Sequence, residues 1–460
     1  MMLLTQAAQA LGARLVGAEV EFASVGTDSR QIEPGSLFVA LRGEHFDGAQ
    51  FIRTAAARGA VAAMINADSF HSDDVAACPL LLVDDTRLAL GRLAAYWRGR
   101  FDIPVVALTG SNGKTTVKEM LAAILAEQTG SAEQVLATRG NLNNDIGMPL
   151  TLLRMNAGHR YAVIEMGMNH SGEIDYLTRL ARPDVALVNN AAGAHLAGLG
   201  TVENVARAKG EIFAGLGGSG IAVINADDAY AGLWHDLAQP HRIITFALDA
   251  EAEVSACWDV TEFGIQMDLV TPAGNAAVHL QVPGAHNARN ALAAAAAAVA
   301  LGIPLPVIVA GLQDFRGVAG RLQRKPARNG ATVIDDTYNA NPESVRAALK
   351  VLAQLRGRRI FVLGDMGELG EDAPRLHAEI GAEARRLGLN ALLALGDLSR
   401  EAVQAFGAGA RHFGNIEDLN RALGEELAPD VTVLVKGSRF MKMERVVGSC
   451  IEGEETCCSH

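Results

Sequence analysis

Apolar runs of strand length alternate with helical patterns over the first part of the chain. The runs are residues 37–41, 61–65 and 80–83, and a helical pattern at 48–59 separates the first two. Short apolar runs bounded by turn residues are typical of buried strands, and helices between them indicate parallel pairing. Residues 1–84 are therefore predicted to form a small α/β domain.

The same alternation continues on a larger scale as far as residue 312. A helix at 85–98 leads into buried apolar strands, which are predicted at 105–108, 161–166, 185–188 and 221–225. Repeated strand–helix units of this kind predict a doubly wound parallel sheet. Residues 251–282 change to alternating polar and apolar residues, which predicts a small antiparallel addition.

A third α/β unit is predicted from residue 313 onward. Its four strands share apolar and β-branched residues and lie at 332–336, 359–364, 391–396 and 431–436. No repeat of solenoid length runs through the chain. The predicted fold class is therefore α/β, with a central doubly wound parallel sheet. Its three domains are predicted at 1–84, 85–312 and 313–460.

One stretch, residues 291–312, contains no charged residue and is long enough to span a bilayer. It is mostly Ala, and Gly302 and Pro304 interrupt it, so two buried helices joined by a turn are predicted instead. The N-terminus lacks the basic segment and the cleavage site of a signal peptide. We therefore expect a cytoplasmic protein with no membrane span.

Composition narrows the classes of partner. The chain has 49% hydrophobic and 20% charged residues, which allows a large core, and its formal net charge is −12. Such a charge disfavours non-specific binding to nucleic acid or to acidic membranes. The five Cys residues have no zinc-ligand spacing and are expected to be reduced thiols.

The clearest chemistry lies where the strand at 105–108 ends in a Gly-rich turn that opens a helix. Backbone N–H groups of such a turn converge on one point, and the helix N-terminus adds a positive dipole, so the turn suits a phosphate. The Lys is expected to reach the β- and γ-phosphates, and the Thr after it to contact Mg²⁺. The residues of this predicted phosphate loop are Gly110, Ser111, Asn112, Gly113, Lys114, Thr115 and Thr116.

Polar residues follow the next strands, at the edge where a doubly wound sheet binds ligands. Glu165 ends its strand and is a candidate to hold Mg²⁺ together with Thr115. His195 follows a later strand, and a structural role is about equally possible for it. Lys209 lies on a helix, and its spacing alone indicates an ordinary surface charge.

Two further groups of polar residues each allow two interpretations. Asn287 and Asn290 open the Ala-rich helix, where Asn is a common cap, but an Asn amide can also read adenine. Arg321 follows a Gly-rich turn. Asp336 ends a strand, where a carboxylate suits ribose hydroxyls or a metal, and it also belongs to a segment of ordinary turn residues. The residues alone leave these alternatives open.

Together, the phosphate loop, Glu165, His195, Lys209 and the Asn-rich helix start resemble the muramyl ligase family. The resemblance keeps order and spacing over essentially the whole chain. Members of this family form amide bonds with ATP in bacterial cell-wall synthesis. The resemblance implies an N-terminal domain for a UDP-sugar, a central ATPase domain and a C-terminal Rossmann-like domain. It also implies a ligation through an acyl phosphate.

Three segments are similar to the branch of this family that joins D-alanyl-D-alanine to UDP-N-acetylmuramoyl-tripeptide. They are residues 140–150, 335–342 and 364–370. This similarity implies those two substrates, with ATP and two Mg²⁺ ions as cofactors, and we expect a monomer. The alternatives are another amino-acid ligase of the same family, or a regulatory protein that only hydrolyses ATP.

The resemblance also implies roles for matching residues at the two ends of the site. Substrate contacts would come from Ser29, Arg30, Asp47, Gly48 and Asn144. In the ATP site, Asn287 would read adenine, Asp336 would hold the ribose, and Arg321 would lie near the phosphates.

Magnesium would be held by Thr115, Glu165 and His195. The family's equivalent of Lys209 is commonly carbamylated and then ligates or positions the second ion, which reverses the surface interpretation of this Lys. Lys114, Lys209 and His195 would thus be the catalytic residues. The tail 453–460 matches no feature of the family.

Overall fold

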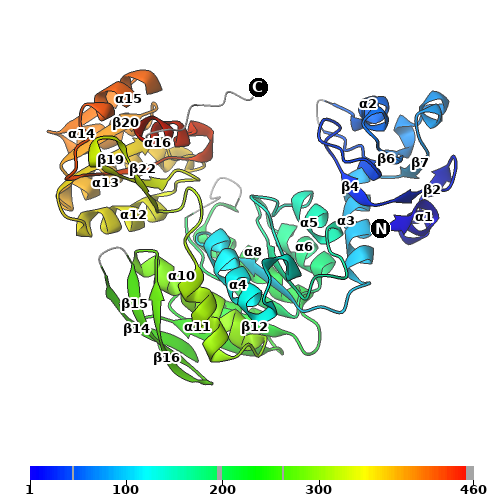
Figure 1. The fold of residues 1–460 in the computed structure, drawn as a ribbon, viewed down its shortest axis with the longest axis horizontal. Coiled ribbons are helices and arrows are strands. Elements are labelled where there is room, and N and C mark those ends of the chain that lie inside the picture. The colour runs from blue at the N-terminus through cyan, green and yellow to red at the C-terminus, as the bar shows by residue number, and fades with distance from the viewer. Residues whose placement is uncertain (44–45, 194–198, 262–263, 452–460) are drawn as a thin grey trace.

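The computed structural model describes residues 1–43, 46–193, 199–261 and 264–451. Three lobes follow one another along the chain, with the N-terminal lobe at the upper right of Figure 1, the central lobe below and the C-terminal lobe at the upper left. Each lobe has its own main sheet. The predicted α/β class with three units is confirmed, and the domain limits at 84/85 and 312/313 stay predictions.

The N-terminal sheet has the strand order β2, β7, β6, β5, β4, with β2 antiparallel to β7 and the other neighbours parallel. Its strands are Arg14–Val16 (β2), Ser24–Gly26 (β4), Ser36–Val39 (β5), Ala62–Asn66 (β6) and Leu80–Val83 (β7). A separate pair joins Met2–Leu3 (β1) to Glu21–Phe22 (β3), and the helix Leu4–Leu11 (α1) follows β1.

The helix expected at 48–59 is shorter than predicted. The structure has a 3₁₀ turn at Gly48–Phe51 (η1) and then the helix Ile52–Ala57 (α2). At Gly48 the chain passes so close to the segment after β5 that a Cβ would lie 2.6 Å from the carbonyl oxygen of Leu41. This close approach accounts for a glycine at the start of the turn.

The helix Thr86–Arg98 (α3) connects the first two lobes. It begins at Asp85, whose carboxylate accepts hydrogen bonds of 2.8 and 2.9 Å from two N–H groups of the first turn. One apolar core extends along it, from Leu81 of the N-terminal sheet to Ile164 of the central sheet. The two lobes therefore pack against a common helix.

The central sheet has nine strands in the order β16, β15, β14, β13, β12, β11, β8, β10, β9. They are Val105–Thr109 (β8), Val135–Ala137 (β9), Tyr161–Glu165 (β10), Val185–Val188 (β11), Ile221–Asn225 (β12), Arg242–Ala247 (β13), Val254–Val260 (β14), Ile265–Thr271 (β15) and Gly274–Leu280 (β16). From β14 to β9 the neighbours are parallel. The doubly wound sheet that the apolar pattern predicts is confirmed.

Helices cover both faces of this sheet, and the residues of β8 show why. Val106 and Leu108 lie in the core formed with α4, α10 and α11, whereas Val105 and Ala107 lie in the core formed with α3, α5, α6 and α8. The helices of this lobe are Lys114–Thr129 (α4), Gly147–Leu153 (α5), Glu173–Ala181 (α6), Val202–Gly210 (α8), Ala231–Leu237 (α9), Ala285–Ala300 (α10) and Leu305–Asp314 (α11).

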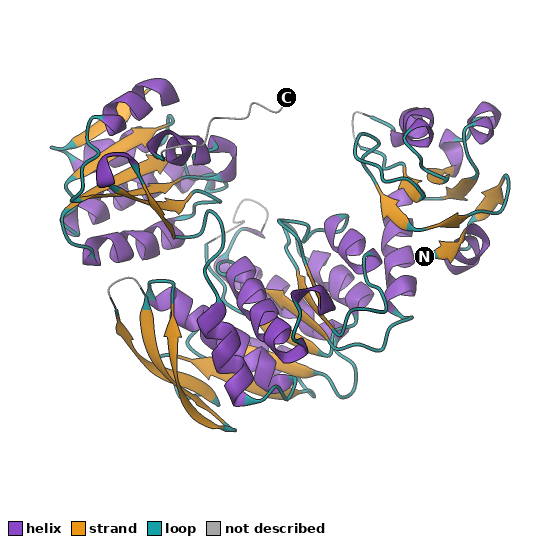
Figure 2. Cartoon of the chain, in the orientation of Figure 1, coloured by secondary structure: helices purple, strands orange, loops and turns teal. Residues whose placement is uncertain are grey.

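Strands β14, β15 and β16 form an antiparallel extension at one edge of the central sheet (Figure 2). Exposure along β15 alternates residue by residue, because α10 and α11 cover one of its faces. The predicted antiparallel addition is confirmed. It continues the central sheet, since β14 pairs in parallel with β13.

The uncharged stretch 291–312 forms most of α10 and α11. The turn between them contains Gly302 at a φ of 72°, and the Ala-rich face of α10 is buried against the sheet. Two helices and a turn are therefore confirmed. Of the helices in the described ranges, none is both long and apolar enough to cross a membrane.

The C-terminal sheet has six strands in the order β17, β18, β22, β19, β20, β21. They are Gln323–Pro326 (β17), Thr332–Asp336 (β18), Arg358–Gly364 (β19), Ala391–Leu395 (β20), Ala410–Phe413 (β21) and Val431–Lys436 (β22). Its helices are Pro342–Gln354 (α12), Ala373–Arg386 (α13), Ser399–Phe406 (α14), Ile416–Gly424 (α15) and Glu444–Cys450 (α16). The four predicted strands are confirmed, and β17 and β21 add one strand at each edge.

Candidate functional site

Three strand ends meet at one edge of the central sheet. β8 lies between β10 and β11, so the order of strands reverses there, and α/β sheets bind ligands at such a point. The phosphate loop follows β8, Glu165 ends β10, and Asn189 follows β11. The structure thus brings together residues that are far apart in the sequence.

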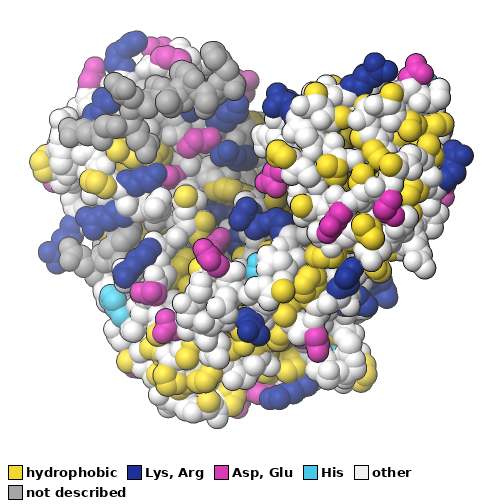
Figure 3. Space-filling model, turned by 45° about the vertical axis from the view of Figure 1, so that its right-hand side comes forward, with side chains coloured by type: hydrophobic (Ala, Val, Ile, Leu, Met, Phe, Trp, Pro, Cys, Tyr) yellow, Lys and Arg dark blue, Asp and Glu magenta, His cyan; other side chains and the backbone are white. Residues whose placement is uncertain are grey.

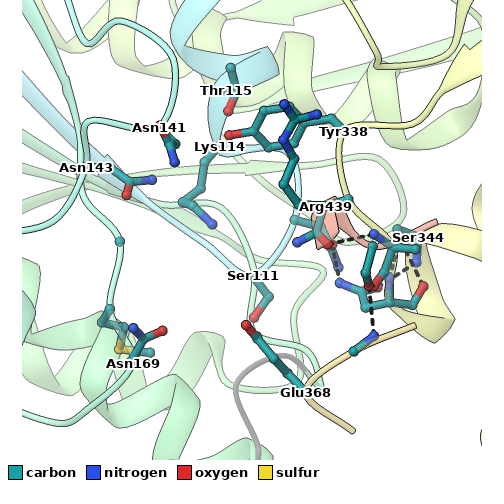
Figure 4. Close-up of a pocket in the computed structure, with 18 of the residues that line it drawn as sticks. Ser111, Lys114, Thr115, Asn141, Asn143, Asn169, Tyr338, Ser344, Glu368 and Arg439 are labelled. Carbon is teal, nitrogen blue, oxygen red and sulfur yellow. Dashed lines mark hydrogen bonds between the residues drawn. The ribbon is translucent and has the colours of Figure 1, made fainter. Parts of the chain in front are cut away.

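A cavity of about 830 Å³, here called the large cavity, opens at this edge. Its lining combines the phosphate loop and Glu165 with residues of the C-terminal lobe. Figure 3 shows the hollow between the lobes, with Lys and Arg side chains on its walls. Figure 4 shows Lys114 between Asn143 on one side and Tyr338 and Arg439 on the other. A ligand here would touch both lobes.

The phosphate loop is held in shape by side chains from the loop after β11. The carbonyl oxygen of Asn112 accepts hydrogen bonds from the amides of Asn189 and Asn190 at 2.9 and 3.0 Å, and its N–H donates to Asn190 at 2.8 Å. The Ser111 N–H donates to the Asn190 carbonyl at 3.0 Å. The loop is therefore set before any nucleotide binds.

Gly113 occupies a position that excludes a side chain. Its φ is 79°, and a Cβ would lie 2.3 Å from Oδ1 of Asn290 and 2.7 Å from Nδ2 of Asn189. Positive φ and this close approach both require glycine. The turn therefore brings the start of α4 against Asn290 in the second turn of α10.

Lys114 points into its own loop, where its Nζ donates to the Gly110 carbonyl at 2.7 Å. Burial lowers the pKa of Lys114, and Glu165 opposes this shift while Arg321 adds to it. A partly buried cation that faces a cavity, and whose one acceptor among the described residues is a carbonyl, is suited to an anionic ligand.

Glu165 is 2% exposed and has one satisfied and one unsatisfied oxygen. Its Oε1 accepts from Nδ2 of Asn143 at 2.8 Å, whereas its buried Oε2 has no hydrogen-bond partner among the described residues. Hard cations such as Mg²⁺ bind carboxylate oxygens. An orphaned carboxylate oxygen of a residue on the wall of the cavity that Thr115 also lines therefore fits a metal ligand.

Lys209 is 2% exposed, so the interpretation as a surface charge is wrong. Trp234 of α9 packs on the helix of Lys209 and donates from Nε1 to the Ala206 carbonyl at 2.9 Å. Burial lowers the pKa of Lys209 well below 10.5, and Lys114 lowers it further. His195 lies outside the described residues, as does the tail 453–460. Within the described ranges, no group of three His, Cys, Asp or Glu residues could hold a metal.

A second cavity of about 660 Å³ lies on the other side of the phosphate loop. Thr116 and the start of α10 form part of its wall. Asn287 donates to the Pro283 carbonyl at 2.8 Å and accepts from Asn290 at 3.3 Å, while Gly284 occupies the cap position of α10. The interpretation of Asn287 as a helix cap is therefore wrong, and its amide lies at the cavity wall.

Asp336 lines the second cavity and forms a buried ion pair. Its Oδ2 accepts from Nζ of Lys436 at 2.6 Å, and its Oδ1 accepts from the Leu322 N–H at 3.2 Å. Burial raises the pKa of Asp336, and Lys436 opposes the shift. Sequence reasoning does not find Lys436, which ends β22, although its position at a strand end matches the criterion that selects Asp336.

Arg321 lies between the two cavities and lines both. Its guanidinium stacks 4.1 Å from the centre of the Tyr338 ring, and its NH2 group is 3.5 Å from Oγ1 of Thr115. Its Nε is buried without a partner in the described part of the chain. The residue therefore brings positive charge from the C-terminal side to the start of α4.

The candidate substrate residues of the N-terminal lobe do not line either cavity. Arg30 pairs with Asp28, and its side chain is 82% exposed, whereas Ser29 is buried. Asp47 accepts from the Ser69 hydroxyl at 2.5 Å and from the Ala49 N–H at 2.9 Å.

Gly48 packs on Ala40 and Leu41, which follow β5. Asn144 does line the large cavity, and its Oδ1 also accepts from the Gly147 N–H at 2.8 Å, at the start of α5. Sequence reasoning does not single out Asn143, its neighbour, which contacts Glu165.

Family models match three successive parts of the chain. Residues 21–98 match the Mur ligase family catalytic domain, residues 108–298 match the Mur ligase middle domain, and residues 320–439 match the Mur ligase glutamate ligase domain.

Individual proteins match along nearly the full length. The chain is 43% identical to the UDP-N-acetylmuramoyl-tripeptide–D-alanyl-D-alanine ligase of Escherichia coli (strain K12), over 99% of both chains. A crystal structure of MurF from Acinetobacter baumannii is 37% identical with a TM-score of 0.89, over 96% of this chain and 97% of that one. The MurF ligase from Thermotoga maritima in complex with ADP is 26% identical with a TM-score of 0.80, over 93% and 96% of the two chains.

Proposed function

The chain belongs to the Mur ligase family, and from this premise we propose that it joins D-alanyl-D-alanine to UDP-N-acetylmuramoyl-tripeptide, driven by ATP. The products are the UDP-muramyl-pentapeptide, a peptidoglycan precursor, with ADP and phosphate. The observation that carries the proposal is the full-length match to ligases of that name. The phosphate loop on the wall of a cavity between two lobes supports it.

Ligation requires the tripeptide carboxylate to become a better electrophile. A carboxylate oxygen attacks the γ-phosphorus of ATP, ADP leaves, and an acyl phosphate forms. The amine of the dipeptide then attacks the acyl carbon and loses its proton, and phosphate leaves. Lys114 and Arg321 face this cavity with positive charge, which offsets the charge of the phosphates and of the incoming carboxylate. Charges fixed in position in this way supply much of the rate in phosphoryl transfer.

We place the adenosine of ATP in the second cavity. Asn287 and Asn290 lie on its wall with their amides, and an amide offers both a donor and an acceptor to an adenine ring. Asp336 would accept from a ribose hydroxyl, and Thr116 would lie near the α-phosphate. An ADP complex of a relative supports nucleotide binding in this fold.

We also propose that two magnesium ions bind between the phosphates and the strand ends. Bound there, they would draw negative charge from the phosphate oxygens. Glu165, Thr115 and His195 would hold them. The unsatisfied Oε2 of Glu165 supports this assignment. A buried carboxylate oxygen without a hydrogen-bond donor destabilises the fold unless a cation binds to it.

Glu165→Gln tests the metal assignment. The amide can keep its oxygen on Asn143, but it removes the negative charge and puts an NH₂ group where Oε2 lies. We expect the Mg²⁺ concentration for half-maximal nucleotide binding to rise by about tenfold or more. Calorimetric titration of ADP at a series of Mg²⁺ concentrations measures this.

Glu119→Gln is the matched control, since Glu119 lies on α4 but pairs with Lys118 away from the cavity. The control should keep the wild-type Mg²⁺ dependence. An unchanged dependence in Glu165→Gln would remove Glu165 from the metal site.

Lys209 is proposed to be carbamylated. CO₂ adds to a neutral amine with loss of a proton, and the carbamate oxygens suit Mg²⁺. The low pKa of Lys209 supports this, because burial and Lys114 increase the fraction of neutral amine at a given pH.

The UDP end of the acceptor is proposed to bind Ser29, Arg30, Asp47 and Gly48. Asn144, on the wall of the large cavity, is proposed to contact another part of the same acceptor. These assignments rest on the resemblance of the motifs to the family. We further propose a cytoplasmic monomer. The unpaired thiols of Cys78 and Cys450 are compatible with a reducing compartment.

Phosphate release against a matrix of substrates tests the function. The acceptors are UDP-muramyl-dipeptide and UDP-muramyl-tripeptides that end in diaminopimelate or lysine, and the amines are D-alanyl-D-alanine and single amino acids. We expect release only when a tripeptide and D-alanyl-D-alanine are both present. Release with the dipeptide and a single amino acid would indicate another ligase of the family, and release without any acceptor would indicate a regulatory ATPase.

A further inference from the structure

Two asparagines meet across the boundary between the central and C-terminal lobes. Asn341 directly precedes α12 of the C-terminal lobe, and Asn112 lies in the phosphate loop of the central lobe. Their side chains are joined by a hydrogen bond of 2.8 Å from Nδ2 of Asn341 to Oδ1 of Asn112. The predicted phosphate-binding role of the loop does not explain this contact.

The direction of this hydrogen bond follows from the cap of α12. Oδ1 of Asn341 accepts from the Ser344 N–H at 2.9 Å, and the Ser344 hydroxyl accepts from the Asn341 N–H at 3.0 Å. A backbone N–H can only donate, so the oxygen of the Asn341 amide must face the helix. Its NH₂ group therefore faces Asn112, and the partner atom on Asn112 must be the oxygen.

The remaining freedom of Asn112 lies in its side chain. Its backbone N–H and carbonyl are both bonded to Asn189 and Asn190, so the peptide cannot turn. With Oδ1 bonded to Asn341, Nδ2 remains as a donor for another group. No acceptor for Nδ2 is found within the described residues, and Asn112 lines both the large and the second cavity. Because Asn112 lines both cavities, we assign this donor to the space between the proposed sites of the adenosine and of the reacting groups.

We propose that Asn341 is a positioning residue that turns the Asn112 amide so that its NH₂ group donates to the phosphoryl group in transfer. This inference rests on the proposed function, because it assigns ATP phosphates to the space that Nδ2 faces. A donor aimed at phosphoryl oxygens stabilises the charge that develops on them. The donor is fixed only while α12 lies against the phosphate loop, since without Asn341 either end of the amide can face the phosphates.

Other contacts hold the two lobes together, so the role of Asn341 can be separated from docking. Arg321 reaches Thr115 at 3.5 Å from the segment that precedes β17. Partial desolvation raises the pKa of Glu343, in the first turn of α12, and a backbone hydrogen bond from Gly193 of the central lobe opposes that shift. A change confined to the Asn341 amide is therefore expected to leave the lobes in contact.

Asn341→Asp is the informative substitution. The carboxylate keeps the oxygen that caps α12, but it offers no donor to Asn112. The Asn112 amide then turns over, donates to the introduced carboxylate and presents its oxygen to the phosphates. We expect kcat to fall about 10–100-fold, with a KM for D-alanyl-D-alanine within about twofold of wild type and an unchanged melting temperature.

A double-mutant cycle with Asn112→Ala separates this mechanism from the added negative charge. If Asn341 acts through the Asn112 amide, Asn341→Asp should cost less than about twofold in the Asn112→Ala background. An equal loss in both backgrounds would overturn the proposal, because the charge alone would then explain it. Wild-type turnover in Asn341→Asp would overturn it as well.

Two further measurements keep the test decisive. If Asn112→Ala turns over too slowly, binding affinities take the place of kcat in the cycle. They are measured for wild type, the two single variants and the double variant, with a non-hydrolysable ATP analogue and with ADP. The expected loss of analogue binding in Asn341→Asp should again disappear in the Asn112→Ala background, and its persistence there would overturn the proposal.

Asn415→Ser and Asn341→Ser form the matched control pair. Asn415 caps α15 of the same lobe by the same bond, to the Asp418 N–H at 2.8 Å, far from both cavities, and Ser retains the capping oxygen. Asn415→Ser should keep wild-type kinetics, whereas Asn341→Ser should lose turnover. Equal kinetics in the two Ser variants would contradict the proposal. Absence of ligation by the wild-type protein would instead refute the proposed function.

Discussion

Lys114→Met should lower the rate of acyl-phosphate formation by at least about 10²–10³-fold. The substitution keeps the apolar stem and removes the ammonium, so the β- and γ-phosphates lose a cation in the cavity between the two lobes. Single-turnover formation of ADP, with acceptor and ATP bound, measures the effect. A wild-type rate would remove the phosphate loop from the mechanism.

The same substitution should not destabilise the fold. Burial lowers the pKa of Lys114, which means that the folded state disfavours its charged form at neutral pH. The melting temperature of Lys114→Met is therefore expected to equal or exceed that of wild type.

Lys118→Met is the contrasting variant on the same helix. The buried Nζ of Lys118 donates to the Thr138 carbonyl at 2.6 Å. Lys118 lines neither cavity. Loss of this charged hydrogen bond should cost about 1.5–3 kcal/mol of stability while most turnover remains. A Lys114 variant that melted like the Lys118 variant would indicate a structural rather than a catalytic lysine.

Lys209→Ala should be nearly inactive while it stays folded and binds ATP. The carbamate proposed on this residue supplies anionic oxygens to the metal site, and removal of such a group costs about 10²–10³-fold or more in turnover. Acetate should restore part of the activity, because its carboxylate can replace the missing carbamate oxygens. Turnover of the variant at increasing acetate concentration measures this.

Two variants serve as controls for the rescue. Lys209→Arg should stay inactive with or without acetate, because guanidinium keeps its charge and takes up no CO₂. Lys114→Met should also be insensitive to acetate, since it lacks a cation rather than an anion. Near-wild-type turnover of Lys209→Ala without acetate would sink the carbamate proposal.

Nuclear magnetic resonance with carbon-13-labelled bicarbonate provides a readout independent of activity, because only proteins with Lys209 should show the carbamate signal.

The sequence predicts much of this fold because its clearest features, the phosphate loop and the Ala-rich helix, each depend on residues that are close together in the chain. The phosphate loop needs only one strand, one turn and one helix start, and Thr109 to Thr116 contain the whole of it. The Ala-rich helix α10 and its end near Gly302 follow in the same way. Strands β17 and β21 are harder, because they lie at sheet edges and carry charged residues such as Arg324 and Arg411.

The pairs within the site depend on strand order, which apolar runs do not specify. Asp336 and Lys436 are 100 residues apart and meet because β22 inserts between β18 and β19. Asn143 meets Glu165 because the segment before α5 folds back over the end of β10. Lys209 is buried in the folded chain, where Lys114 of another helix is close enough to lower its pKa. A single helix pattern therefore cannot distinguish this Lys from a solvated one.

The shared core along α3 bears on the length of acceptor that the protein can use. The apolar core that includes Leu81 and Ile164 makes the first two lobes one packed body, whereas the C-terminal lobe has cores of its own. Under the proposed binding of the UDP end to the first lobe, packing of the two lobes would fix the distance from that end to Lys114. A peptide stem of the wrong length would stop short of the phosphates or overshoot them. The first two lobes would thus determine which peptide length reaches the phosphates. The third lobe, through the proposed role of Asn341, would determine when the phosphoryl group is transferred.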